Sequence, residues 1–125
     1  MRRGLSEIKS PTIQIAVDMK NTIGILPAAG VASRLRPFLH PKELLPILFT
    51  LDRQSGEARP MLAAEYSLVA MREAGIEKCI VIINEAKSEI LKYFGNGSEL
   101  GMNLVYAVQS EPAGLPQAIA VATPW

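Results

Sequence analysis

The residues of this chain best suited to chemistry are basic side chains that follow a loop of small residues. The loop Ala28-Ala29-Gly30-Val31-Ala32-Ser33 offers a ligand little besides backbone N–H groups, which a phosphate can approach closely. Arg34, Arg36 and Lys42 come next, and no Asp or Glu lies between Asn21 and Lys42 to neutralise them. This pattern predicts a local anion site with phosphate as its natural ligand; the alternative is a solvated basic face.

The glycine-rich phosphate motifs do not fit this loop. The dinucleotide fingerprint needs three spaced glycines, whereas only Gly30 is present, and no Gly-Lys-Ser/Thr follows it. His40 is the sole histidine and is interpreted as a loop residue. The acidic candidates are scattered, so no catalytic triad, metal cage or paired-carboxylate hydrolase is predicted from Glu85, Glu89, Glu99 and Glu111.

Composition limits the partners. The 125 residues are 49% hydrophobic and 20% charged, which is typical of one globular domain or part of one. With 13 basic and 12 acidic side chains, the formal charge is +1, so no broad attraction to nucleic acid or to an anionic membrane is expected. The single cysteine, Cys79, lies in an apolar run and is predicted to be a buried thiol. A lone cysteine cannot form an internal disulfide, and no apolar run approaches the length of ~20 residues that a membrane helix needs. Both observations indicate a cytoplasmic protein.

Hydrophobic periodicity predicts the elements that position the loop. Four apolar runs indicate strands, at 22–26, 47–51, 78–83 and 103–109. Three helices are predicted, at 61–74, at 87–94 and after a second loop at 110–116. This order predicts an α/β fold with a three-layer, Rossmann-like, mostly parallel sheet. The loops after the first and last of these strands are then expected at the same edge of the sheet.

Prolines and apolar faces refine this arrangement. Pro60 is expected to open the 61–74 helix, where a missing N–H costs nothing. Apolar residues spread around that helix, so we expect it to pack against the sheet and also against a second subunit or an absent part of the fold. Three prolines between 37 and 46 exclude a long helix and would hold Lys42 on a stiff, non-helical arm. Residues 1–21 are interpreted as an N-terminal extension, partly flexible, and 22–125 as a nucleotide-binding portion.

Four motifs, in order, resemble those of the sugar-phosphate nucleotidyltransferases. Residues 26–37 resemble the family signature A-[AG]-G-x-G-[ST]-R-L-x-P, and residues 41–46 resemble P-K-x-L-[LV]-P. Residues 95–109 resemble the segment that precedes the base-reading loop in glucose-1-phosphate thymidylyltransferases, and residues 114–118 resemble G-L-A-Q-A. The resemblance, which extends to the UTP-glucose-1-phosphate uridylyltransferases, begins at Ile23 and implies a truncated domain of the nucleotide-diphospho-sugar transferase type.

The resemblance also implies a reaction. A sugar 1-phosphate would attack the α-phosphorus of a nucleoside triphosphate, dTTP or UTP, and release pyrophosphate with the assistance of Mg²⁺. The backbone from Ala28 to Ser33 would hold the nucleotide and its phosphates. Arg34 would hold the triphosphate and the leaving pyrophosphate, and Lys42 would neutralise the α-phosphate as charge builds in the transition state.

The base edge, by the same resemblance, would be read by Gln109 and the backbone of Gly114, with Gln117 nearby. Ala32 stands where the family has a second glycine; if that position needs a positive φ, alanine costs on the order of 1 kcal/mol. The family's two metal-binding Asp residues and its sugar pocket lie beyond the matched portion, so the isolated chain is expected to be weakly active or inert. Two alternatives are a non-catalytic nucleotide- or partner-binding module and a cytidylyl- or molybdopterin guanylyltransferase.

Overall fold

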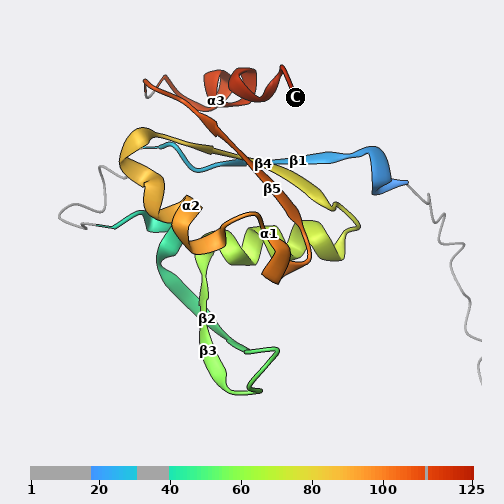
Figure 1. Cartoon of the computed structure of the whole chain (residues 1–125). Helices are drawn as coiled ribbons and strands as arrows, with labels where there is room; N and C mark the ends of the chain where they lie inside the picture. Colours follow the sequence, from blue (N-terminus) through green and yellow to red (C-terminus); the bar gives the residue numbers. More distant parts are fainter. Residues whose placement is uncertain (1–17, 31–39, 112) are drawn as a thin grey trace, which may run out of the picture.

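A three-stranded parallel sheet lies between helices on both of its faces (Figure 1). The computed structural model describes residues 18–30, 40–111 and 113–125. The strand order in the sheet is β1 (Ile23–Pro27), β4 (Lys78–Ile83) and β5 (Asn103–Val108). Helix α3 (Leu115–Ala122) covers one face, and α1 (Ala63–Glu73) and α2 (Ser88–Phe94) cover the other. This arrangement confirms the predicted three-layer α/β fold with a parallel sheet.

Strand β4 is central because its side chains are apolar on both faces. Cys79, Val81 and Ile83 point into the cluster under α1 and α2. Ile80 and Ile82 alternate with them and point into the smaller cluster under α3. All five are at least nine-tenths buried, as expected of a parallel strand that is covered from both sides. The strands predicted at 78–83 and 103–109 therefore match β4 and β5 closely, and the one at 22–26 is displaced by a single residue.

The layers also approach each other closely at a glycine. A Cβ placed on Gly24 of β1 would lie 2.7 Å from Met71 Sδ of α1. Any larger residue would therefore require the flexible Met71 side chain to shift. Helix α1 buries Leu68 completely against this face, while Tyr66 on the opposite side is 52% exposed. The packing of α1 against the sheet is confirmed, and its second expected contact stays a prediction.

A second sheet is a hairpin formed by β2 (Pro46–Leu51) and β3 (Ala58–Leu62), which projects from the lower end of the molecule in Figure 1. The prediction that Pro60 opens the 61–74 helix was wrong, because Pro60 lies within β3 and residues 61 and 62 belong to the same strand. Pro60 pairs with Phe49, and α1 begins only at Ala63. A proline is tolerated here because, among the described strands, β3 pairs with β2 alone, so a missing N–H can face the open edge.

The hairpin exposes large apolar side chains. In β2, the side chains of Ile47, Leu48, Phe49 and Leu51 are 50%, 50%, 80% and 67% exposed. Apolar surface of this kind favours burial against another surface. The homo-oligomer suggested by the sequence stays a prediction.

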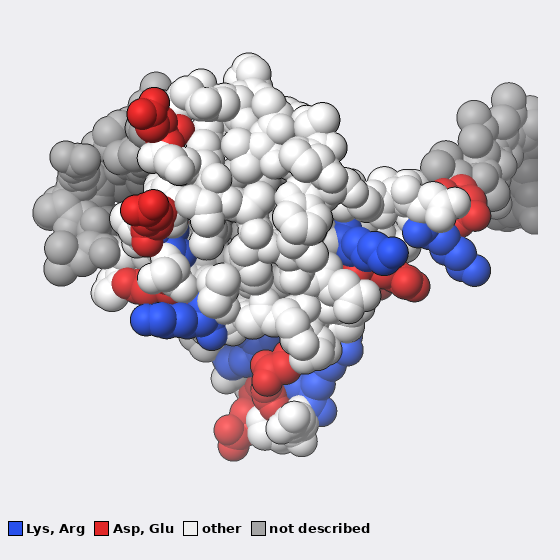
Figure 2. All heavy atoms as spheres, turned by 45° about the horizontal axis from the view of Figure 1, so that its top comes forward, with Lys and Arg blue, Asp and Glu red and all other residues white. Residues whose placement is uncertain are grey.

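Four single 3-10 turns complete the described structure: η1 (Met19–Asn21), η3 (Lys42–Leu44), η4 (Glu85–Lys87) and η5 (Ser98–Leu100). Of the predicted N-terminal extension, residues 1–17 lie outside the described part of the chain. None of the described helices is long and apolar enough to cross a membrane. On the face shown in Figure 2, acidic and basic side chains lie near one another at the rim, and no broad patch of one sign forms.

Candidate functional site

The carboxyl ends of the three parallel strands bring the two predicted loops to one edge of the sheet. Pro27 of β1 is level with Ile82, and Val108 of β5 is level with Ile83. Since neighbouring strands lie about 4.8 Å apart, the two loops leave the sheet about 10 Å from each other, on either side of β4. Their first peptide groups are both tied to β4. Ala28 N–H donates to the Ile82 carbonyl (2.7 Å) and Gln109 N–H donates to the Ile83 carbonyl (2.8 Å).

The first loop becomes exposed at its third residue. Ala28 and Ala29 are buried, whereas Gly30 is exposed. The Ala28 N–H is already used by β4, so Gly30 is the first residue that presents an exposed backbone to a ligand. The Ala29 carbonyl accepts a 2.8 Å hydrogen bond from Asn84 Nδ2. Four further predicted site residues lie outside the described part of the chain, so their roles stay predictions: Val31, Ala32, Ser33 and Arg34.

Lys42 is the first residue of the 3-10 turn η3, and its side chain is exposed. The expectation of a wholly non-helical arm was therefore wrong at this point. A turn of three residues fits between Pro41, which precedes it, and Pro46, which begins β2, whereas a longer helix does not. The next residue, Glu43, points inward and both of its carboxylate oxygens lie 3.0 Å from Lys87 Nζ.

The second loop brings all three of its predicted residues together. Gln109 is 5% exposed, and its Nε2 lies 3.4 Å from the Gly114 carbonyl and 3.3 Å from Gln117 Oε1. A carbonyl only accepts hydrogen bonds, so this contact assigns the amide nitrogen to the side facing Gly114. Within the described residues, no hydrogen bond to the amide oxygen of Gln109 is formed. Gly114 has φ 88° and ψ 176°, a conformation essentially restricted to glycine.

Within residues 18–30, 40–111 and 113–125, no group of three or more His, Cys, Asp or Glu side chains could hold a metal ion. The nearest carboxylate to Lys42 along the chain, Glu43, is occupied by Lys87. Cys79 is 1% exposed, and burial raises the pKa of its thiol to about 11, which confirms the predicted buried cysteine.

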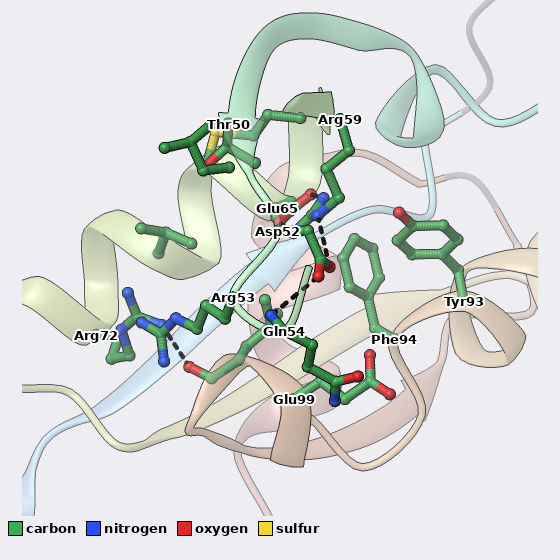
Figure 3. A pocket seen from close by; sticks show the side chains of 14 residues that line it. Thr50, Asp52, Arg53, Gln54, Arg59, Glu65, Arg72, Tyr93, Phe94 and Glu99 are labelled. Atoms are coloured by element: carbon green, nitrogen blue, oxygen red, sulfur yellow. Dashed lines mark hydrogen bonds and ion pairs between the residues drawn. The ribbon is translucent and has the colours of Figure 1, made fainter. Parts of the chain in front are cut away.

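A separate cavity of about 590 Å³ lies between the hairpin and the α1, α2 and η5 elements (Figure 3). It is lined by none of the predicted site residues. Arg59 spans it, with Nη1 3.0 Å from Glu65 Oε2 and Nε 3.9 Å from Asp52 Oδ2. Burial raises the pKa of Glu65, but hydrogen bonds from Arg59 and from the Leu62 N–H, with the charge of Arg59, outweigh it and lower the pKa. These contacts attach the hairpin to the start of α1.

Three residues at the sheet edge were missed by reasoning from the sequence: Glu43, Asn84 and Lys87. Asn84 could have been found, because it directly follows β4 and so lies beside both loops. The Glu43–Lys87 pair joins residues 44 positions apart, and no local spacing pattern reveals such a contact. Asn84 Oδ1 is buried, and within the described part of the chain it has no hydrogen-bond partner.

Most of the chain is similar to known proteins. A family model for nucleotidyl transferases matches residues 23–124. The chain is 36% identical over 102 residues to the low-salt glycan biosynthesis nucleotidyltransferase Agl11 of Haloferax volcanii, a match that covers 79% of this chain and 26% of that protein. It is 35% identical over 101 residues to a glucose-1-phosphate thymidylyltransferase of Mycolicibacterium smegmatis, covering 78% of this chain and 31% of the relative.

A solved structure has the same fold. A Bacillus anthracis protein assigned as a glucose-1-phosphate thymidylyltransferase superposes with a TM-score of 0.65 at 24% sequence identity. The superposition covers 82% of this chain and 39% of that chain. The chain thus spans about a quarter to a third of the length of the curated relatives it matches.

Proposed function

Because the chain belongs to the nucleotidyl transferase family, we propose that it supplies the nucleoside-triphosphate site of a sugar-1-phosphate nucleotidyltransferase. One observation carries the proposal. Loops from β1 and β5 flank β4 at the same sheet edge, one with an exposed glycine backbone and the other with a buried amide. Carboxyl edges of this kind are where open α/β sheets bind nucleotides.

The proposed reaction is the attack of a sugar-phosphate oxygen on the α-phosphorus of the triphosphate. The new phosphorus–oxygen bond forms as the bond to the β-phosphate oxygen breaks, and pyrophosphate leaves with the electron pair. Charge grows on the phosphate oxygens in the transition state, so positioned cations carry much of the acceleration. Lys42 is the described cation suited to this role, with Arg34 proposed alongside it.

Magnesium belongs to the proposal through the family resemblance alone. The described residues offer no side-chain group that fits the ion, and we derive no step through it. The sugar 1-phosphate, its binding pocket and turnover by the whole protein are also proposals, as is a cytoplasmic location. The isolated 125 residues are expected to bind a triphosphate with little or no turnover; the alternative is a non-catalytic binding module. Magnesium-dependent release of pyrophosphate by this chain would contradict that expectation.

The second loop favours a uracil or thymine base. Both bases carry an N3–H donor, which matches the amide oxygen that Gln109 keeps after its nitrogen has bonded Gly114. Cytosine carries an acceptor at the same ring position and would leave two acceptors facing each other. We therefore propose dTTP or UTP, and not CTP, as the nucleotide, which disfavours the cytidylyltransferase alternative.

The test is a calorimetric titration of the chain with UTP and with dTTP, repeated on Lys42→Ala. Loss of one phosphate-binding cation should weaken binding about tenfold, which corresponds to about 1.4 kcal/mol. Lys92→Ala is the matched control, because Lys92 is an exposed lysine of α2 remote in sequence from both loops. Equal affinities for the parent chain and Lys42→Ala would exclude Lys42 from the site.

A further inference from the structure

The segment that follows β4 contacts described residues that precede and follow positions 31–39 in the sequence. Asn84 Nδ2 donates to the carbonyl of Ala29, which precedes those positions, at 2.8 Å. Lys87 Nζ reaches both oxygens of Glu43, which follows them, at 3.0 Å. An exposed third contact joins His40 Nδ1 to Glu89 Oε2 at 3.1 Å. One short segment, residues 84–89, therefore holds the two pieces of chain that carry the proposed phosphate contacts.

The Glu43–Lys87 pair determines which way the η3 turn faces. Their side chains are 8% and 9% exposed, so each charge depends on the other for its partner. A carboxylate held through both oxygens has little freedom to rotate. Lys42 is adjacent to Glu43 in a tight turn, and it is exposed because its neighbour points inward. The buried pair thus orients Lys42 toward solvent.

The Asn84 contact has a similar effect on Gly30. In a trans peptide the carbonyl and the following N–H point in opposite directions. Asn84 draws the Ala29 carbonyl toward itself, so the Gly30 N–H must point away from Asn84. Gly30 is exposed, whereas Ala29 is 2% exposed. The hydrogen bond therefore fixes the direction of a backbone donor on an exposed residue.

We propose that Asn84 and Lys87 are positioning residues, which hold the Gly30 N–H and the Lys42 ammonium in place for one triphosphate without touching it. This inference rests on the proposed nucleotide site. The competing explanation is that the two contacts only stabilise the fold.

The experiment distinguishes a role in positioning Lys42 from a role in stabilising the fold. It compares the single variant Lys87→Met with a double variant that carries both Glu43→Met and Lys87→Met. The single change leaves a buried carboxylate without its partner, whereas the double change replaces the pair by apolar side chains of similar length, which often keeps stability. Lys92→Met is the matched control, a lysine-to-methionine change at an exposed site of α2. All measurements are made at a temperature at which every variant is folded.

Hydrogen exchange is the ligand-free measurement. The Leu44 N–H donates to the Pro41 carbonyl (3.0 Å) and the Leu45 N–H to the Lys42 carbonyl (3.1 Å), so these two amides report the η3 turn. In the double variant we expect them to exchange about tenfold faster, with Ile80 and Val81 of β4 unchanged. Parent-like exchange at Leu44 and Leu45 in the double variant would overturn the role given to Lys87.

UTP titration is the second measurement. The double variant should bind UTP about tenfold more weakly than the parent chain, even where its melting temperature is restored. Asn84→Asp keeps the side-chain shape but removes the donor to Ala29, and we expect a similar loss. Parent-like UTP affinity in both variants would overturn the inference while leaving the proposed function intact. If the parent chain itself fails to bind UTP, the proposed function fails, and the exchange result still decides whether Lys87 orders the turn.

Discussion

Gly30 is the position at which a substitution best distinguishes an effect on nucleotide binding from an effect on folding. Within the described part of the chain, a Cβ added at Gly30 would have no neighbour within 4 Å, and its φ lies outside the left-handed region. Gly30→Ala should therefore fold normally. Alanine also restricts the unfolded chain, so stability should stay equal or rise by about 0.4–1 kcal/mol. For a domain of 125 residues, that is a rise in melting temperature of at most about 4 °C.

The same substitution should weaken nucleotide binding, because a methyl group would keep phosphates away from the exposed backbone. We expect UTP affinity to fall about tenfold or more, measured by calorimetry beside a thermal melt. Gly114→Ala is the contrasting variant. Its φ of 88° makes alanine cost about 1–3 kcal/mol of stability, although the nearest atom to the added Cβ, Pro116 Cδ, is 3.8 Å away. Unchanged UTP affinity in Gly30→Ala would refute the reasoning about the first loop.

Two further predictions concern buried groups. With a pKa raised to about 11, Cys79 should be about one part in a thousand thiolate at pH 8, so a disulfide reagent should label it only after unfolding in urea; rapid labelling of the native chain would contradict its burial. Because the pKa of Glu65 is lowered in the folded chain, its contact with Arg59 should stabilise the fold above the ordinary value of 4.5 and lose that contribution as the pH falls through the lowered pKa. Urea unfolding at several pH values should therefore show that Glu65→Gln loses less stability below pH 4.5 than the parent chain does. If the free energy of unfolding falls equally with pH in both proteins, Glu65 does not contribute to the acid sensitivity of the fold.

Much of the parallel sheet could be predicted because its signals are local. A continuous apolar run such as Cys79 to Ile83 indicates a strand buried on both faces, and the glycine after α2 marks its end. Of the hairpin, strand β2 was predicted and strand β3 was not. A proline before an apolar run usually opens a helix, and only the pairing of Pro60 with Phe49 shows that it occupies an open-edged strand.

In the candidate site, too, the contacts between residues near in sequence could be predicted, and those between residues far apart could not. Gln109, Gly114 and Gln117 lie within nine residues of one another, and their convergence follows from a strand, a loop and a helix in order. The contacts that hold the first loop and Lys42 come from residues far along the chain. Asn84 meets Ala29 across 55 positions, and such pairings depend on the sheet order and not on any spacing in the sequence.

The central claim is that two loops at one sheet edge form a site for a uridine or thymidine triphosphate. Calorimetric titration of the 125-residue chain with UTP, and separately with CTP, tests it most directly. We predict saturable binding of UTP at one site, with CTP at least about tenfold weaker because of the Gln109 amide. Equal affinity for the two nucleotides would contradict the assignment of the second loop, and no binding of UTP or dTTP would contradict the site itself.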